Sequence, residues 1–334
     1  MLCRSALVAA VASTSVLLAV PGPAGAAVNR VPLEDVRVVT TVAPITSIVA
    51  SVGSDLVTIH GLVPEGADSH TFEPAPSAAR ELSQADVVFV NGLGLEDPTE
   101  RLARRNLKPG AEIVELGARA ITKRQYLYDF SFPKSGGKPN PHLWTNPPYA
   151  KSYARVVADV LARRDPRHAA EFEANFRRFA TQADALDAAM KQASASMTDR
   201  QRRLLTYHDA YAYFGRHYRW KIVGAIQVSS FEDPTPRQVG RLIMQVRRLG
   251  VPAIFGSEVF PSPVLEQIGD EAHVRYVDKL RDDDLPGEPG DSGHSWLGLM
   301  KLDFVTMVKA LRGDASPLLA VPTSLVRDRA VYPQ

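Results

Sequence analysis

The amino-acid sequence predicts an α/β protein with two lobes, each a mostly parallel sheet flanked by helices, joined by a long rigid helix. Short β-rich apolar runs alternate with helical patterns in the first part of the chain, and the same alternation returns later. A long stretch free of glycine and proline separates the two sets. Strands that alternate with helices pair in parallel, because each helix carries the chain back across the sheet.

The first lobe is expected over residues 27–165. Short apolar runs in this part of the chain predict buried strands at 36–42, 56–63, 87–93 and 112–116. Helical patterns lie between the earlier strands, at 45–53 and 76–85. Apolar runs of this length, enriched in valine, isoleucine and leucine, are typical of strands covered on both faces.

A single long helix is predicted between the lobes, within residues 166–198. From Arg167 to Met197 the chain contains neither glycine nor proline, and large apolar side chains recur at alternating steps of four and three. This spacing gives one continuous apolar face on a helix roughly 45 Å long. A coiled-coil oligomer would need a longer stripe with less phenylalanine. We therefore expect a monomer in which the helix lies along both lobes. The stripe consists of Phe172, Phe176, Phe179, Ala183, Leu186 and Met190.

The second lobe is expected over residues 199–334. Its predicted strands are 203–208, 221–228, 253–260 and 274–280, with a helical pattern at 237–250. Two segments are predicted to be loose loops because glycine, proline and polar residues dominate them. They are residues 134–140 and the acidic stretch 281–293.

The composition and charge of the chain argue against a nucleic-acid partner. The chain has 334 residues, of which 45% are hydrophobic, and a formal net charge of +2. Its 39 basic residues are scattered rather than gathered in a tract. A nucleic-acid partner is therefore not expected.

Residues 1–26 are expected to be a signal peptide. An apolar stretch at 6–20 is followed by the small residues 24–26, a pattern typical of a cleaved secretory signal. The stretch is shorter than the about 20 residues that span a membrane. The one cysteine, Cys3, lies upstream of it and is not placed to carry a lipid. We expect an exported protein, periplasmic or extracellular and soluble after cleavage, with neither disulfides nor thiolate metal ligands.

Histidines at the boundaries of the predicted elements are the candidates for chemistry. Of the eight histidines, four stand where a strand ends, a rigid loop runs or a helix begins: His70, His142, His208 and His294. Ligands bind at such carboxyl-end loops in parallel sheets. The other four fall in helix patterns, within an apolar strand or just before one, and are expected to be structural. Because the four candidates are far apart in sequence, only the fold can bring them together.

The surroundings of His142 favour a fixed side chain. It stands in the segment PNPHLWTNPP at 139–148, where prolines fix the backbone and remove hydrogen-bond donors. Such a loop loses little conformational entropy when a ligand is engaged. Trp144 is expected to be a buried apolar anchor for the turn.

Three motifs resemble those of the metal-binding solute receptors of bacterial ABC importers, the cluster A-I or TroA-like zinc and manganese group. The first family motif, D-P-H-x-(Y/F)-E-P, stands here as residues 68–74 with Ser69 in place of the proline. The second, D-P-H-x-W-x-x-P, stands as residues 140–147 with Asn140 in place of the aspartate. The third, an aromatic residue followed by H-D-A, stands as residues 207–210. The similarity covers nearly all of the chain after the signal.

The resemblance implies a metal site between the lobes, built from the histidines of the three motifs. Alignment on LGLMK places His294 where the family carries an aspartate. The ligand set is then four imidazoles, or three with Asp291 or water. Three further carboxylates are candidates for charge balance around the site: Glu258, Asp209 and Glu73. Glu258 could instead cap a helix, and Asp291 could be one more solvated charge.

The resemblance further implies that the exported protein captures a metal ion and delivers it to a membrane permease served by an ATPase. Imidazole nitrogen favours Zn²⁺, whereas Mn²⁺ prefers oxygen ligands, so manganese is the alternative cargo. The histidine-rich loop of many zinc-specific relatives is missing before the second motif. A secreted zinc hydrolase is less favoured, because the sequence carries neither an HExxH helix motif nor a nucleophile elbow. A structural protein with a vestigial site is a third hypothesis. Metal capture by neutral imidazole should weaken as pH falls toward 5.

Overall fold

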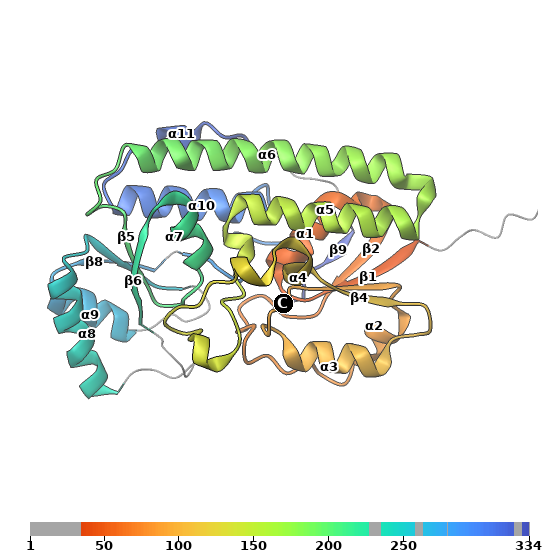
Figure 1. Ribbon diagram of the computed structural model, residues 1–334, viewed down its shortest axis with the longest axis horizontal. Helices are drawn as coiled ribbons and strands as arrows, with labels where there is room; N and C mark the ends of the chain where they lie inside the picture. The colour runs from red at the N-terminus through yellow and green to blue at the C-terminus, as the bar shows by residue number, and fades with distance from the viewer. Residues whose placement is uncertain (1–34, 227–234, 258–262, 279, 324–328, 334) are drawn as a thin grey trace, which may run out of the picture. The chain divides into compact units, whose positions relative to one another are not determined.

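The computed structural model describes residues 35–226, 235–257, 263–278, 280–323 and 329–333 (Figure 1). The predicted signal peptide, Cys3 and Glu258 lie outside the described residues. Within the described part, every helix is too short or too polar to cross a membrane.

The first sheet has five parallel strands in the order β4-β3-β1-β2-β9. The chain moves outward from β1 in both directions, so the strand order reverses at the centre of the sheet. Ligands bind at the carboxyl ends of strands beside such a reversal. The strands are β1 (Val36–Thr40), β2 (Val57–Gly61), β3 (Val87–Val90), β4 (Glu112–Glu115) and β9 (Ala330–Val331).

The second sheet has four parallel strands in the order β6-β5-β7-β8. Its order reverses at β5, the strand that leads to His208. The two sheets therefore offer the same kind of binding edge. The strands are β5 (Arg203–Thr206), β6 (Lys221–Ala225), β7 (Ala253–Phe255) and β8 (Arg275–Val277).

Helices cover both sheets, as strand-helix-strand connections require. In the first lobe they are α1 (Ala43–Gly53), α2 (Ala78–Gln84), α3 (Asp97–Asn106), α4 (Leu116–Ala120) and α5 (Pro147–Arg164). The remaining helices are α6 (Ala169–Ala195), α7 (Ala212–Tyr218), α8 (Pro236–Leu249), α9 (Pro263–Ala272), α10 (Trp296–Ala310) and α11 (Ser316–Leu319). Short 3-10 turns occur at Ser54–Leu56, Lys123–Gln125, Lys134–Gly136, Leu143–Thr145 and Pro166–His168.

The long helix α6 confirms the predicted connection between two lobes. It packs on α1 and α5 from the first lobe and on α7 and α10 from the second (Figure 1). Its predicted apolar stripe is buried except at Phe176, which is half-buried under the guanidinium of Arg155. Burying one large apolar side chain contributes about 1.5–3 kcal/mol, so the stripe fixes the helix on its neighbours.

The apolar core continues from one lobe to the other. One cluster joins Ile48 of α1, Leu161 of α5 and Leu186 of α6 to Phe214 of α7 and Phe304 of α10. A shared core of this kind makes the lobes behave as one packed body around α6. The carboxyl ends of both sheets are therefore held in a fixed relation.

The predicted strands agree with the observed ones in place and differ at their ends. The predicted runs extend beyond the observed strands, and those at 221–228, 253–260 and 274–280 include residues outside the described ranges. Strand β9 was not predicted. It returns the end of the chain to the first sheet beside β2, so the expected second lobe also contributes a strand to the first sheet.

Local signals explain where two of the helices begin. Two prolines, Pro147 and Pro148, occupy the start of α5, where a missing backbone N–H costs nothing. They also end the rigid loop of His142. Helix α8 begins at a capping box between Thr235 and Gln238 and ends at Gly250, whose φ of 61° is left-handed.

Candidate metal centre

Three of the four candidate histidines come together although they lie in three separate loops. His70 stands in the loop between β2 and α2, and His142 stands just before the 3-10 turn Leu143–Thr145. His208 follows the end of β5. All three loops leave the carboxyl-terminal side of a strand or lead into a helix, which is where parallel sheets place binding residues.

The Nε2 atoms of these histidines converge. Those of His70 and His142 are 3.2 Å apart, and those of His70 and His208 are 3.0 Å apart. Two ligands of a tetrahedral zinc ion with bonds of about 2.0–2.1 Å lie about 3.3–3.4 Å apart. Among the histidine, cysteine and carboxylate side chains that the structure describes, these three form the one group of three or more with ligand atoms within 4.8 Å of one another.

The burial of the three rings is uneven. His142 is 0% exposed and His208 is 4% exposed, whereas His70 is partly exposed. The imidazoles of the second and third motifs are therefore more enclosed than that of the first motif.

Several hydrogen bonds hold the loop around His142 in place. Asn140 accepts hydrogen bonds from the Nδ1 and the backbone N–H of His142, at 2.9 Å and 3.0 Å. The hydroxyl of Thr145 donates to the His142 carbonyl at 2.9 Å. The side-chain N–H of Asn91 donates to the carbonyl of Pro141 at 3.0 Å. With Nδ1 acting as donor, the lone pair of His142 stays on Nε2, where a metal would bind.

Trp144 anchors this loop as predicted and also links it to the second lobe. It is 0% exposed. Its indole N–H donates to the carbonyl of Asp282 at 2.8 Å, and its own carbonyl accepts from the indole of Trp296 at 3.0 Å. The rigid loop is therefore a junction between the lobes rather than a surface feature.

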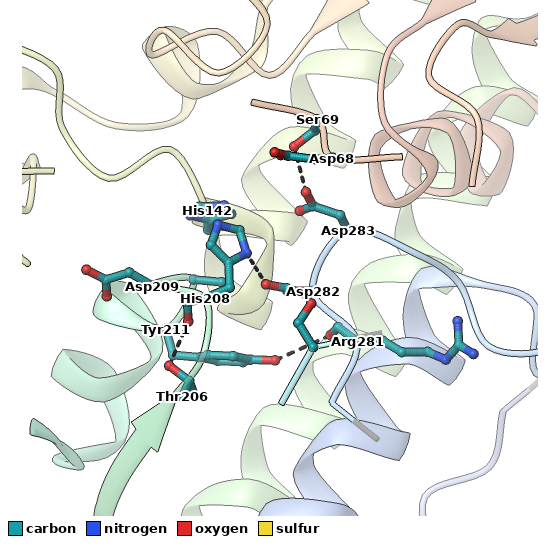
Figure 2. A network of polar contacts seen from close by, with 12 residues as sticks. Asp68, Ser69, His142, Thr206, His208, Asp209, Tyr211, Arg281, Asp282 and Asp283 are labelled. Carbon is teal, nitrogen blue, oxygen red and sulfur yellow. Dashed lines mark hydrogen bonds and ion pairs between the residues drawn. The ribbon is translucent and has the colours of Figure 1, made fainter. Parts of the chain in front are cut away.

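His208 is oriented by a carboxylate that the sequence analysis did not single out. The Nδ1 of His208 forms a hydrogen bond with Asp282, and the hydroxyl of Ser257 donates to the same carboxylate at 2.9 Å. The His208 carbonyl accepts from Thr206 at 2.6 Å. Figure 2 shows Asp282 and Asp283 rising from one loop, the first toward His208 and the second toward Ser69.

The three imidazoles differ in pKa. Burial, with the charge of His208, lowers the pKa of His70 well below its usual value. Burial, with the charges of His208 and His70, does the same to the pKa of His142. Burial also acts to lower the pKa of His208, but the Asp282 carboxylate outweighs it and raises that pKa to about 9. At neutral pH and without metal, His208 is therefore a positively charged imidazolium. A metal ion that binds its Nε2 must displace the proton on that nitrogen.

The acidic run at 282–284 is the part of the site that sequence reasoning missed. It was predicted to be a loose loop, but Asp282, Asp283 and Asp284 are 3–6% exposed. Asp283 accepts from the hydroxyl of Ser69 at 2.6 Å, and its other oxygen is buried without a hydrogen bond. Burial and the charge of Asp282 raise the pKa of Asp283. The available signal was the position of this run, directly after a predicted strand and between Leu280 and Leu285.

His294 is buried, but the structure does not bring it to the other three histidines. It is 5% exposed, and its Nε2 lies 3.6 Å from a carboxylate oxygen of Glu65. Its ring packs against Tyr332 with the centroids 4.7 Å apart. In the structure, His294 therefore lies outside the group of converging imidazoles, and its place as a fourth ligand stays a prediction.

The other candidate carboxylates fall into two groups. Asp209 is buried beside the centre and accepts from the backbone N–H of Ser131 at 2.9 Å. Asp291 is exposed and closes a turn by accepting from the backbone N–H of Glu288 at 3.0 Å. Glu73 is exposed as well. Of these three, Asp209 is the one placed to influence the charge at the centre.

The fold and the three convergent imidazoles define a class: two-lobed α/β binding proteins with a metal site where the lobes meet. The ZnuA family, described as zinc-uptake complex component A, periplasmic, matches residues 38–310. The match covers most of the chain, and the protein therefore belongs to this family. It is a metal-binding, substrate-binding protein of the ABC transporter type and not an enzyme.

Individual relatives agree with this assignment. The metal ABC transporter substrate-binding lipoprotein FimA of Streptococcus parasanguinis is 25% identical over 275 residues, covering 82% of this chain and 89% of FimA. The manganese-binding lipoprotein MntA of Halalkalibacterium halodurans is 26% identical over 278 residues, covering 83% and 89%. Both relatives are named lipoproteins, so they do not support the expectation of a protein without a lipid anchor.

Solved structures share the architecture. The periplasmic zinc-binding protein TroA from Treponema pallidum superimposes with a TM-score of 0.74 at 25% identity, covering 82% of this chain and 98% of TroA. A manganese-bound periplasmic metal-binding protein from candidatus Liberibacter asiaticus superimposes with a TM-score of 0.70 at 23% identity. These likenesses confirm the predicted two-lobed fold with its long helix.

Proposed function

We propose that this protein captures Zn²⁺ outside the cytoplasmic membrane with His70, His142 and His208, and delivers it to an ABC importer permease served by an ATPase. The observation that carries the proposal is the convergence of three Nε2 atoms from three distant loops. Each ring of the enclosed pair is already oriented through its Nδ1, one by Asn140 and one by Asp282. Such preorganisation is what a capture site needs, since little ordering remains to be done when the ion arrives.

Asp283 is our candidate for the fourth ligand, in place of His294 or Asp291. Its buried oxygen without a hydrogen bond is the feature that favours it. It also accepts a hydrogen bond from Ser69, which directly precedes His70 in the first motif. A carboxylate at this position would also offset part of the ion's +2 charge, which three neutral imidazoles leave uncompensated.

The donor set favours zinc over manganese. Three imidazoles with one carboxylate suit a tetrahedral Zn²⁺ ion, whereas Mn²⁺ prefers more oxygen ligands. Manganese stays the alternative, because MntA and several further relatives are named for manganese. Elemental analysis of protein purified from medium with both metals decides between them: one equivalent of zinc supports the proposal, and one equivalent of manganese replaces it.

The ligand set is tested by metal titration of matched variants. His142→Ala and His294→Ala each remove one buried histidine, but only the first lies in the cluster. Losing an outer partner of a ligand costs about 10–100-fold in affinity, so losing a ligand should cost at least about 100-fold. We expect that loss for His142→Ala and wild-type affinity for His294→Ala. Equal losses in both would contradict the assignment.

The fourth ligand is tested in the same way. Asp283→Asn and Asp291→Asn each remove one negative charge from the same stretch of chain, one at a buried and one at an exposed position. We expect weaker zinc binding for Asp283→Asn alone. If Asp291→Asn is the weaker binder, the fourth ligand is the exposed aspartate.

Delivery is tested with the importer itself. Zinc uptake into vesicles that contain the permease and ATPase should depend on added receptor and should fail with His142→Ala. Fractionation of the producing cells should place the mature chain outside the cytoplasmic membrane, and detergent extraction would reveal whether it is held there. Uptake at the same rate without the receptor would refute the transport function while leaving metal capture intact.

A further inference from the structure

The segment 126–133 places a phenylalanine against the metal centre. The ring of Phe132 lies 5.6 Å from the ring of His70 and 5.7 Å from that of His142, measured between centroids. Phe132 is itself half-buried. Its ring therefore borders the partly exposed ligand His70 and the fully buried ligand His142 at the same time.

This position of Phe132 is fixed by hydrogen bonds on both sides of it. The backbone N–H of Asp129 donates to the Phe132 carbonyl at 3.1 Å, which closes a tight turn. The backbone N–H of Ser131 donates to the carboxylate of Asp209 at 2.9 Å. Asn140, which orients His142, also donates to the carboxylate of Asp129 at 2.8 Å. The turn that carries Phe132 is thus bonded to the loops of two ligands.

The base of the segment is held by the second lobe as well as the first. The backbone N–H of Leu127 donates to the hydroxyl of Tyr213 at 3.2 Å, and its carbonyl accepts from Asn140 at 2.9 Å. Burial and the charge of Asp209 raise the pKa of Asp129, so that carboxyl can be protonated beside its acidic neighbour. Four hydrogen bonds to other parts of the chain therefore hold this segment in place beside the site.

An aromatic wall beside two ligands changes which ions fit. Zn²⁺ is satisfied by four ligands in a tetrahedron, but Mn²⁺ favours an octahedral shell that includes water. A phenyl ring can neither ligate the ion nor hydrogen-bond to a coordinated water. Water on that side would lose hydrogen bonds, so an ion that needs the extra waters binds less well.

We propose that Phe132 is a specificity-determining residue, which disfavours six-coordinate ions by denying water a place beside His70 and His142. The proposal rests on the proposed function, since it concerns ions bound by the same three histidines. Phe132 would then influence metal selectivity without being a ligand. The segment 126–133 contains no histidine that could bind zinc.

The experiment compares Phe132→Ala and Phe132→Leu with Phe130→Ala. Phe130 is 44% exposed in the same segment, so its removal controls for general loosening of the turn. Zinc and manganese affinities are measured for each variant by competition titration. We expect Phe132→Ala to lower the ratio of zinc to manganese affinity about tenfold, and Phe132→Leu and Phe130→Ala to keep it within about twofold of wild type.

A spectroscopic readout separates this role from a merely structural one. Co²⁺ absorbs strongly when four-coordinate and weakly when six-coordinate, so its visible spectrum reports the number of ligands. We expect strong bands in wild type and Phe130→Ala, and weakened bands in Phe132→Ala because water joins the ion. Unchanged spectra and an unchanged affinity ratio in Phe132→Ala would overturn the role of Phe132.

The outcomes also distinguish failure of this inference from failure of the proposed function. Wild-type protein that binds neither zinc nor manganese would overturn both. Wild-type protein that binds zinc, loses it in His142→Ala and gives the same affinity ratio in Phe132→Ala would overturn the inference alone. A lowered ratio in Phe130→Ala as large as in Phe132→Ala would also overturn it, by showing that loosening of the turn is sufficient.

Discussion

Replacing Asp282 by asparagine should change the pH at which the protein captures zinc. In the wild-type protein the Asp282 carboxylate raises the pKa of His208 to about 9, against an unperturbed value of 6.5. His208 must be neutral to bind a metal, so protons compete with zinc for this ligand. In Asp282→Asn the carboxylate is gone while the burial remains, and the pKa of His208 should fall to 6.5 or below.

The size of the effect follows from these pKa values. At pH 7, two units below a pKa of about 9, only about one His208 in a hundred is neutral, which weakens zinc binding about 100-fold. The logarithm of the wild-type affinity should therefore rise by about one per pH unit from pH 7 and level off near pH 9. His70 and His142 add little to this slope, because their pKa values are lowered and they are already neutral. In Asp282→Asn the curve should level off near pH 6.5.

The assay is zinc titration against a competing chelator at intervals between pH 6 and 9.5. Asp187→Asn is the matched control, because Asp187 on α6 accepts from His217 on α7 at 2.7 Å in a similar histidine–carboxylate pair outside the cluster. It should retain the wild-type curve. A wild-type affinity that stays flat between pH 7 and 9, or an Asp282→Asn curve parallel to it, would refute the assignment of the proton to His208.

Three further predictions concern the framework of the site. Trp144→Phe keeps an apolar ring at a fully buried position but loses the indole hydrogen bond to the Asp282 carbonyl. It should lower the free energy of unfolding, measured by urea denaturation, by roughly 1–3 kcal/mol. An unchanged denaturation midpoint would show that this hydrogen bond is dispensable. Asn140→Asp restores the family motif but removes the amide donor to Asp129 and to the Asp209 carbonyl, and it adds a buried charge. It should therefore destabilise the protein by roughly 2–4 kcal/mol. A more stable variant would show that these two hydrogen bonds do not hold the loop. Free zinc at 100 times its dissociation constant should stabilise the wild-type protein by about 2.7 kcal/mol and raise its melting temperature; a melting temperature unaffected by zinc or chelator would indicate that the native state does not bind the ion.

Sequence reasoning succeeded where the signal was local. Strand and helix alternation, and the stripe from Phe172 to Met190, predicted two parallel sheets and the helix between them. Of the four candidate histidines, the structure brings together His70, His142 and His208, each of which stands at an element boundary. The resemblance to a known family added the order of the three motifs.

It failed where long-range packing decides the outcome. The position of the aspartates at 282–284 between two leucines was the one local signal, and it is weak because the partners that bury them lie on other loops. His294 was aligned with a family ligand, and in the structure it lies beside Glu65 and outside the histidine cluster. Strand β9 is two residues long and gains its stability from β2, so its sequence carries little signal.

X-ray absorption spectroscopy at the zinc edge would reveal the ligand set itself, because it counts the ligands and shows which are imidazoles. For the zinc-loaded wild-type protein, we expect four N or O ligands at about 2.0–2.1 Å, with the scattering pattern of three imidazole rings. The pattern should fall to two rings in His208→Ala if zinc is still bound. A six-coordinate oxygen shell with fewer than two imidazoles in the wild type would contradict capture by the three histidines.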